Sequence, residues 1–301
     1  GMKFVVTGGA GFIGSHIVKL LVNKGHSVDV VDNLHTGKKE NLGTIFNEIN
    51  FYQIDIRDKE ELRRIMKDCD GVFHQAALTV VPESFKIPQE YFDVNVEGTR
   101  NIFEIAKNEK QRVVYASSSS VYGNVDKIPI TENFEKNPVN PYGKTKLEDE
   151  LLAEKFSKEG TEIIGLRYFN VFGIGQTGSY AGVITKFMNA LSEKKSPIIY
   201  GDGSQIRDFV YVEDVAKANF AAMMNKTEFG FFNVGTGKAV SIKELAELMI
   251  KLYKLELTPK YSKVLPGDIK QSKADPKQMK DLIGWEYETK LEDGLKNMLN
   301  I

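Results

Sequence analysis

A glycine-rich stretch near the N-terminus constrains the fold of this chain more than any other segment. The motif TGGAGFIG places Gly8, Gly11 and Gly14 at three-residue spacing. An apolar run at residues 4–6 precedes the motif, and an amphipathic helical pattern over residues 12–24 follows it. Glycines at such a turn let backbone amides and a helix N-terminus approach a pyrophosphate. The stretch therefore predicts a dinucleotide-binding turn between the first strand and the first helix.

An acidic residue at the end of the second predicted strand refines this interpretation. Asp32 follows the strand at residues 28–31 and lies 18 residues after Gly14. A carboxylate at this place can accept hydrogen bonds from the ribose hydroxyls of adenosine, and it would repel a 2′-phosphate. NAD is therefore favoured over NADP. We interpret the nearby Lys38 and Lys39 as solvated surface charges.

Short β-branched runs alternate with longer helical patterns through the first half of the chain. The predicted strands lie at residues 4–6, 28–31, 51–54, 71–74, 112–116 and 163–166, and the predicted helices at 12–24, 58–67, 89–107 and 142–158. Such alternation is typical of a doubly wound parallel sheet with helices on both faces. After Tyr168 the pattern loosens, but a helix at 212–224 and a strand at 231–234 are expected to return to the first layer.

The composition excludes several classes of function. The 301 residues are 42% apolar and carry a net charge of −1, with lysines scattered among glutamates. No basic face for nucleic acid or an anionic membrane is therefore expected. No apolar stretch reaches the roughly 20 residues that span a bilayer, and no signal-peptide pattern is present, so we expect a cytoplasmic protein. His16, His26 and His35 lack metal-ligand spacing, and no metal is expected.

Three other residues are interpreted as structural. Cys69 is the only cysteine, so an intrachain disulfide is excluded and a buried apolar side chain is expected. His74 follows two apolar residues at a strand end and is expected to be packed and hydrogen-bonded. Trp285 is expected to pack in the core of the last subdomain.

Two polar motifs are candidates for chemistry. Tyr142 and Lys146 stand four residues apart in NPYGKTKLEDE and share a helix face. An ammonium beside a phenol stabilises the phenolate, which lowers the tyrosine pKa from about 10 toward the range of a base. In YASSSSVYG, Ser118 lies 24 residues before Tyr142, at the carboxyl end of a predicted central strand. Ligands of open parallel sheets bind at such strand ends.

Together these features resemble the extended short-chain dehydrogenase/reductase family, and within it the NAD-dependent nucleotide-sugar epimerases and dehydratases. The similarity covers almost the whole chain, in family order: TGGAGFIG, DN at 32–33, DIRD at 55–58, HQAAL at 74–78, NVEGT at 95–99, YGKTK at 142–146, LRYFNVFG at 166–173, GDGSQIRDFVYVEDV at 201–215 and PGD at 266–268. It implies a Rossmann-type doubly wound parallel sheet with a smaller α/β C-terminal substrate-binding domain.

The same resemblance implies domain boundaries and residue roles. The NAD-binding domain is expected at residues 1–170 plus about 211–235, and the nucleotide-sugar-binding domain at about 171–210 plus 236–301. The implied cofactor-binding residues are Gly8, Gly11, Phe12, Ile13, Gly14, Asp32, Asn33, Asp55, Ile56, Ala76, Ala77, Asn95, Tyr142, Lys146 and Tyr168. The implied substrate-binding residues are Ser118, Tyr142, Asn170, Arg207, Asp268 and Ser272. In this scheme Arg207 contacts the diphosphate by charge, and Asp268 accepts ribose hydroxyls.

The residues after Ser118 select among the reactions of the family. Its members share a first step in which the tyrosine takes the 4-hydroxyl proton and C4 hydride passes to NAD, giving a 4-keto sugar. Similar dehydratases carry an acidic pair where this chain has Ser119 and Ser120, and decarboxylases usually keep a glutamate at the second place. A serine without an activating neighbour is a poor acid or base. C4 epimerisation of a UDP-hexose, as in the UDP-glucose 4-epimerases, is therefore favoured, with Ser118, Tyr142 and Lys146 as catalytic residues.

Some features leave alternatives open. Thr79 and Leu265 stand where related epimerases carry lysine and arginine, and Lys263 or Lys270 could replace the missing charge. The small Ser272 leaves N-acetylated sugars open as substrates. Other candidates are a UDP-uronic acid 4-epimerase, a nucleotide-sugar reductase or dehydratase, and a non-enzymatic NAD sensor. The resemblance also implies a homodimer in which helices near 90–107 and 142–158 pair into a four-helix bundle.

Overall fold

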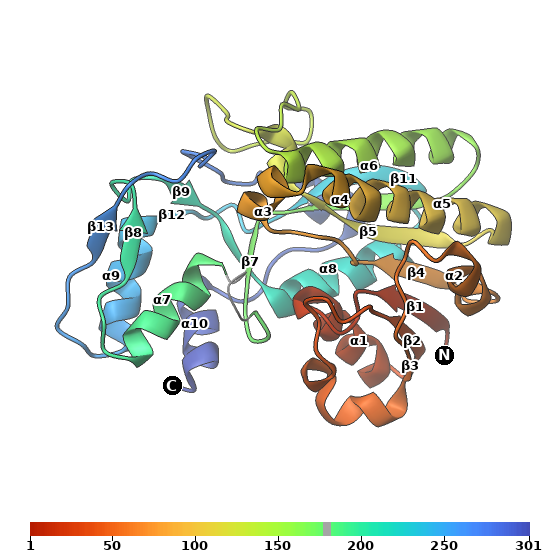
Figure 1. The fold of residues 1–301 in the computed structure, drawn as a ribbon, viewed down its shortest axis with the longest axis horizontal. Coiled ribbons are helices and arrows are strands. Elements are labelled where there is room, and N and C mark those ends of the chain that lie inside the picture. The colour runs from red at the N-terminus through yellow and green to blue at the C-terminus, as the bar shows by residue number, and fades with distance from the viewer. Residues whose placement is uncertain (177–181) are drawn as a thin grey trace.

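The computed structural model describes residues 1–176 and 182–301. Within these residues, a seven-stranded parallel sheet forms the centre of the molecule (Figure 1). Its strands, in spatial order, are β3 (Asn50–Tyr52), β2 (Ser27–Val31), β1 (Lys3–Thr7), β4 (Gly71–His74), β5 (Arg112–Ser118), β6 (Ile163–Tyr168) and β11 (Phe229–Val234). The chain order reverses between β1 and β4. In sheets of this kind the ligand crevice lies outside the carboxyl ends of the strands at that reversal.

Helices cover both faces of the sheet. Successive strand residues point to opposite faces, and here both faces carry apolar side chains that must be buried. Phe4 and Val6 of β1 belong to one apolar core, and Val5 belongs to the other. Figure 1 shows α1 (Phe12–Asn23) and α8 (Val212–Met224) on one face, with α5 (Gly98–Glu109) and α6 (Pro141–Lys158) on the opposite face. The helix α2 (Lys59–Met66) packs on the face that holds Val5. This arrangement confirms the predicted Rossmann-type doubly wound sheet.

Local sequence signals explain where the key helices begin. Asn140 caps α6 by accepting the N–H of Gly143 at 2.7 Å, and Pro141 occupies its first turn. Asp58 caps α2 in the same way through the N–H of Glu61. The predicted helix at 89–107 is observed as α4 (Pro88–Phe92), a π-helical stretch (Asp93–Glu97) and α5. A short helix, α3 (Val81–Lys86), precedes them, and 3₁₀ turns lie at Lys39–Glu48 and Ser119–Tyr122.

The rest of the chain builds a smaller body beside the sheet, drawn on the left of Figure 1. Three two-stranded sheets pair β7 (Asn170–Phe172) with β10 (Phe209–Tyr211), β8 (Ile198–Tyr200) with β13 (Lys260–Ser262), and β9 (Ile206–Arg207) with β12 (Val240–Ser241). Helices α7 (Val183–Ser192), α9 (Ile242–Leu252) and α10 (Leu291–Leu299) enclose a separate core that contains Phe172, Phe187 and Met249. The helix α8 and the strand β11 return to the main body, as expected. The exact division into two domains stays a prediction.

Two of the three structural interpretations hold, and one is wrong. Cys69 is buried, and so is His74, whose ring nitrogens contact the hydroxyls of Thr7 at 2.6 Å and Thr99 at 2.8 Å. Burial lowers the pKa of His74 to about 3, so the ring is neutral. Trp285, however, packs in the core of the main body, and its indole N–H donates to the carbonyl of Asp214 at the start of α8. The chain therefore returns to the main body once more near its C-terminus.

Candidate active site

A cavity of about 970 Å³ opens at the carboxyl ends of the parallel strands. Most residues predicted to bind cofactor or substrate line it. They are Gly8, Gly11, Phe12, Ile13, Gly14, Asp32, Asn33, Asp55, Ile56, Ala76, Ala77, Ser118, Tyr142, Lys146, Tyr168, Asn170, Arg207 and Ser272. The fold thus gathers positions from the first turn to the C-terminal segment around one space.

The glycine motif forms a narrow turn beneath this cavity. Gly8 has a φ of +68°, which favours glycine. A Cβ at Gly14 would lie 2.0 Å from the carbonyl oxygen of Gly8, so a larger residue cannot occupy that position without moving the turn. Helix α1 begins after Gly11 with no side-chain cap and no acidic residue in its first turn. Its first N–H groups and its dipole therefore form a site suited to an anion.

Asp32 lies beside this turn at the end of β2. One carboxylate oxygen accepts the N–H of Ala10 at 3.0 Å, and the other accepts the N–H of Leu34 at 2.8 Å. Burial raises the pKa of Asp32, whereas these two hydrogen bonds lower it. Each oxygen of an ionised carboxylate has a further lone pair, so the group can still accept hydroxyl donors from the cavity.

Tyr142 and Lys146 project from α6 into the cavity, one turn apart. The Lys146 Nζ donates to the carbonyl of Ala116 at 2.8 Å and lies 5.9 Å from the centre of the Tyr142 ring. Burial raises the pKa of Tyr142 to about 12, and a hydrogen bond from Ser118 counteracts this rise. Burial also lowers the pKa of Lys146, although the nearby Asp149 favours its charged form. The expected lowering of the tyrosine pKa is therefore not found, because desolvation of the phenol raises the pKa more than the hydrogen bond with Ser118 lowers it.

The serine run also lines the cavity. Ser118 ends β5 and caps the 3₁₀ turn Ser119–Tyr122. Its Oγ accepts the backbone N–H of Ser120 at 3.1 Å and contacts the Ser120 hydroxyl at 2.8 Å. Ser119 and Ser120 also line the cavity. The two described residues after Ser118, at positions 119 and 120, therefore bring no carboxylate to the cavity.

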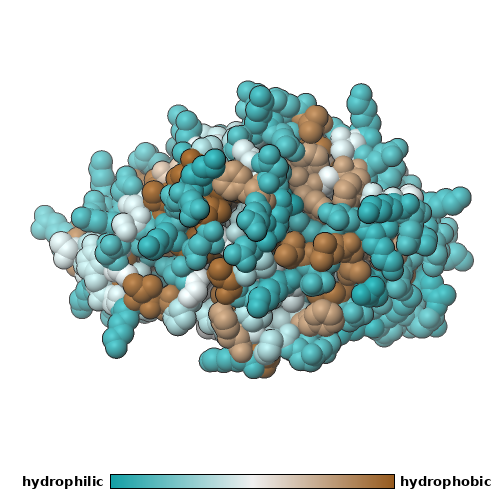
Figure 2. Space-filling view, turned by 90° about the horizontal axis from the view of Figure 1, so that it is seen from above, coloured by the Kyte–Doolittle hydropathy of each residue, from teal (hydrophilic) through white to brown (hydrophobic). Residues whose placement is uncertain are grey.

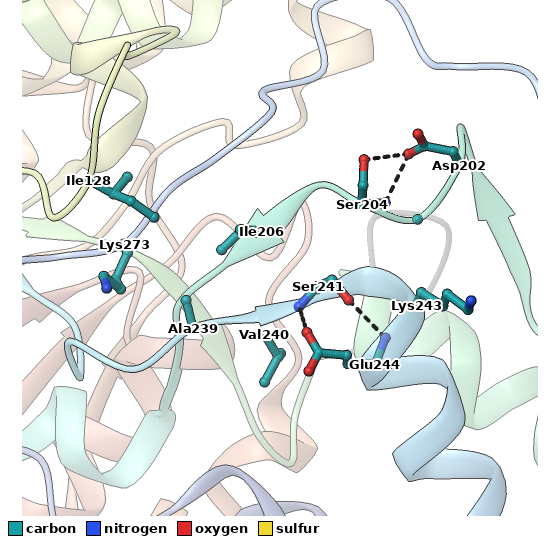
Figure 3. A pocket seen from close by; sticks show the side chains of 11 residues that line it. Ile128, Asp202, Ser204, Ile206, Ala239, Val240, Ser241, Lys243, Glu244 and Lys273 are labelled. Carbon is teal, nitrogen blue, oxygen red and sulfur yellow. Dashed lines mark hydrogen bonds between the residues drawn. The ribbon is translucent and has the colours of Figure 1, made fainter.

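A smaller hollow of about 500 Å³ lies in the second body, between β9, β12 and the start of α9 (Figure 3). Figure 3 shows Ser241 and Glu244 hydrogen-bonded to each other's backbone N–H groups, which is a capping box for α9. Lys243 and Lys273 lie at its edges. None of the predicted site residues lines this hollow, so the candidate active site is the larger cavity.

Comparison with known proteins agrees with this geometry. The model of the NAD dependent epimerase/dehydratase family matches residues 4–235, which include the glycine motif, Asp32, Ser118, Tyr142 and Lys146. The chain belongs to the NAD-dependent epimerase/dehydratase family. The cofactor of the family is NAD, and the described residues fit it. Its pyrophosphate would lie at the uncapped start of α1, against the turn in which a Cβ at Gly14 would collide. Its adenosine ribose would lie at the carboxylate of Asp32.

Epimerase/dehydratase family members with similar sequences and structures have been described. A Methanocaldococcus jannaschii protein, provisionally named UDP-glucose 4-epimerase, is 41% identical over 98% of this chain and 97% of its own length. The structure of UDP-N-acetylglucosamine 4-epimerase from Methanobrevibacter ruminantium, in complex with UDP-N-acetylmuramic acid, has a TM-score of 0.95 and 38% identity, covering 99% of this chain and 97% of that one. UDP-glucose 4-epimerase from Thermotoga maritima, with UDP-glucose, has a TM-score of 0.95 and 36% identity, covering 99% and 98%.

One similar family member has a different name. UDP-N-acetyl-alpha-D-glucosaminuronate decarboxylase from Bacillus cytotoxicus is 34% identical over 99% of this chain and 96% of its own length. Membership in the epimerase/dehydratase family therefore does not by itself fix the reaction.

Two predicted site residues of this chain, Asn95 and Asp268, do not line the cavity. Asn95 is buried. Its side-chain oxygen accepts the N–H of Leu78, and its side-chain nitrogen donates to the carbonyl of Leu78. Asp268 is paired with Arg207, whose Nη2 donates to its Oδ1 at 2.8 Å. The two residues were expected to contact separate parts of the substrate. Their roles toward ligands stay predictions, and the guanidinium of Arg207 has further N–H donors.

Sequence reasoning missed several residues of the site. Gln75 lines the cavity, and its side-chain oxygen accepts the hydroxyl of Tyr168 at 2.7 Å. Asn219 of α8 donates to the same hydroxyl at 2.9 Å. The position of Gln75 directly after β4, in HQAAL, was a signal that could have found it, whereas Asn219 carried none. Thr79 lines the cavity, but Leu265 and the two candidate substitutes, Lys263 and Lys270, do not.

Proposed function

We propose that this protein catalyses redox-neutral C4 epimerisation of a UDP-hexose through a 4-keto intermediate, with tightly bound NAD. One observation carries the proposal. Ser118, Tyr142 and Lys146 line one cavity, and the two residues after Ser118 are serines instead of carboxylates. The site thus has a base for the 4-hydroxyl but lacks, at these positions, the acids that elimination requires.

Each catalytic side chain has a distinct task in this proposal. Tyr142 takes the proton from O4 of the sugar, and Ser118 hydrogen-bonds O4. Lys146, which is anchored to the Ala116 carbonyl, keeps a positive charge near the phenol and binds the nicotinamide ribose. Bound NAD would supply the hydride acceptor for C4 and, once reduced, the hydride donor. After the 4-keto sugar turns about its diphosphate linkage, Tyr142 gives the proton back to O4 on the opposite face.

The proposed substrates are UDP-glucose and UDP-galactose, together with their N-acetylated forms. Ser272 lines the cavity with a small side chain that is 7% exposed. A small residue here leaves space for a 2-acetamido group. The similarity to an enzyme named for UDP-N-acetylglucosamine supports including these sugars, and the similarity to an enzyme bound to UDP-glucose supports the simpler pair.

A second candidate is 4-epimerisation of a UDP-uronic acid. The 34% identity to an enzyme named for a UDP-uronic acid favours it. Arg207 is a cavity cation that could contact a carboxylate, but Asp268 already pairs with it. Decarboxylation is less well supported, because neither residue 119 nor residue 120 is a glutamate.

A substrate panel tests the function. The NAD-loaded protein is incubated with UDP-glucose, UDP-galactose, their N-acetylated forms and UDP-glucuronic acid, and the products are resolved by their C4 configuration. We expect each hexose to equilibrate with its C4 epimer without net formation of free NADH. Accumulation of a 4-keto-6-deoxy sugar, a pentose or stoichiometric NADH would contradict the proposal.

We also propose that the protein acts as a homodimer formed by the outer faces of α4 to α6. Phe92 and Leu151 on these helices are 38% and 51% exposed. Figure 2 views this side and shows apolar side chains between hydrophilic ones. Light scattering should give twice the chain mass, and Leu151→Glu should halve the measured mass.

In the part of the chain that the structure describes, no helix is long and apolar enough to cross a membrane. The cytoplasmic location stays a prediction.

A further inference from the structure

Ser120 contacts the catalytic Ser118 through two separate groups. Its backbone N–H donates to Ser118 Oγ at 3.1 Å, and its own hydroxyl donates to the same oxygen at 2.8 Å. Both contacts result from the 3₁₀ turn Ser119–Tyr122, which begins at Ser118 and folds residue 120 back over it. The proposed reaction so far assigns no task to the Ser120 hydroxyl.

These two contacts decide where the Ser118 proton points. A serine hydroxyl has one proton to donate and two lone pairs to accept with. Ser120 occupies both lone pairs, so the proton of Ser118 is left for another acceptor. Ser118 and Tyr142 line the same cavity, which makes the phenol a candidate for this acceptor. A hydrogen bond with Ser118 lowers the pKa of Tyr142, in agreement with this direction. The three residues therefore form a directed chain from Ser120 through Ser118 to Tyr142.

We propose that Ser120 is a positioning residue that orients and polarises the Ser118 hydroxyl toward Tyr142 and the substrate oxygen. Donation into Ser118 strengthens the bond that Ser118 itself donates, because hydrogen bonds in a chain polarise one another. For the substrate, this inference rests on the proposed epimerase function. For the phenol of Tyr142, it rests on the two contacts between Ser120 and Ser118 and on the cavity that Ser118 and Tyr142 share.

The identity of residue 120 sets the direction of the chain. An ionised carboxylate only accepts hydrogen bonds. At position 120 it would draw the Ser118 proton toward itself and away from Tyr142. A serine at this position therefore has a positive task in epimerisation, besides leaving the site without an acid for elimination.

Titration of the phenol tests the inference without relying on turnover. A fluorotyrosine, whose phenol is more acidic than that of tyrosine, is placed at position 142 of the NAD-bound protein, and its fluorine NMR shift is followed against pH. In Ser120→Ala the titration midpoint should move up by about half a pH unit. Ser120→Thr keeps the donor and should restore the midpoint. Ser192→Ala removes a serine hydroxyl that donates to Asn189 on the distant α7, and it should change nothing.

Kinetics with the natural tyrosine provide a second readout. In Ser120→Ala, kcat below the midpoint should fall roughly threefold, which corresponds to half a pH unit, while KM stays the same. If Ser120→Ala does not fold, Ser120→Cys replaces it, since a thiol keeps the volume but is a weak donor.

The possible failures are distinguishable. If the wild-type protein epimerises no UDP-sugar, the proposed function fails, but the fluorine titration still decides the role of Ser120. If the midpoints of the wild type and Ser120→Ala coincide, the positioning role is overturned, whatever happens to the rate.

Discussion

Arg167 and Glu150 face each other through two parallel hydrogen bonds inside the protein. Arg167 Nε donates to Glu150 Oε2 at 2.8 Å, and Nη2 donates to Oε1 at 2.7 Å. Both side chains are less than 5% exposed, and Ser117 donates to the same carboxylate at 2.7 Å. The pair ties β6 and β5 to α6, the helix that carries Tyr142 and Lys146. It therefore holds α6 against the strand that ends in Ser118.

Loss of this pair should destabilise the fold strongly. Glu150→Gln leaves the buried guanidinium of Arg167 without its counter-charge, and the free energy of unfolding should fall by about 3–5 kcal/mol. Urea unfolding followed by circular dichroism measures this change. As a control, Glu288→Gln breaks the exposed pair with Lys217 and should cost less than about 1 kcal/mol. Equal losses of unfolding free energy in the two variants would show that the buried pair stabilises the fold no more than the exposed pair.

Removal of the Tyr142 hydroxyl should abolish most of the activity. In Tyr142→Phe we expect kcat to fall on the order of 10³-fold, because proton transfer at O4 loses its base. The affinities for NAD and for UDP-sugar should change only slightly. Tyr115→Phe is the matched control, since Tyr115 is also a buried tyrosine but does not line the cavity. Wild-type rates in Tyr142→Phe would rule out the assigned base.

The cofactor preference should depend on the charge of Asp32. In Asp32→Asn, NAD should bind roughly 10-fold more weakly, since hydrogen bonds to a charged acceptor contribute more than those to a neutral one. The ratio of NADP to NAD affinity should rise, because the repulsion of a 2′-phosphate is removed. Calorimetric titration with both dinucleotides measures this ratio. Asp29→Asn, on the same strand but outside the cavity, should leave the ratio unchanged.

The sugar preference should respond to the size of residue 272. Ser272→Tyr fills space beside the substrate, so kcat/KM for the N-acetylated sugars should fall at least about 10-fold more than for UDP-glucose. Ser272→Ala keeps the side chain small and should preserve the ratio between the two substrates. An equal loss for both sugars in Ser272→Tyr would mean that this residue does not face the 2-acetamido group.

The rate should rise with pH over the range in which the protein stays folded. Burial raises the pKa of Tyr142 to about 12, so only a small fraction of the phenol is ionised near neutrality. A base acts only in its deprotonated form, and below the pKa its fraction grows about tenfold per pH unit. Profiles of kcat measured from about pH 6 to about pH 10 check this slope. A flat profile would mean that Tyr142 is already ionised or that another step limits the rate.

The fold of this chain was largely predictable because its signals are local. Apolar periodicity predicts each central strand within a few residues, and the glycine motif with Asp32 predicts which sheet edge binds the cofactor. The motif residues Ser118, Tyr142 and Lys146 then follow from spacing and resemblance, and the structure brings all three to one cavity.

Contacts between distant segments were not predictable from such signals. The pairing of Arg207 with Asp268 depends on how β9 meets the segment after Pro266, and no periodic pattern encodes it. Trp285 was placed in the wrong body for the same reason. The raised pKa of Tyr142 was not predictable either, because it results from burial of the phenol. Burial depends on how the whole molecule packs, and the four-residue spacing of Tyr142 and Lys146 does not encode it.

The repeated return of the chain to the main body has a consequence for how specificity can change. The helix α8, the strand β11 and the segment around Trp285 all pack on the main body. The core of the smaller body takes its residues from before α8, from between β11 and Trp285, and from after Trp285. A single crossover could therefore not exchange the smaller body for that of a relative, because the segments of the two bodies alternate along the described residues. We therefore expect new substrates to be reached more readily by point substitutions, such as one at Ser272, than by exchange of a whole domain.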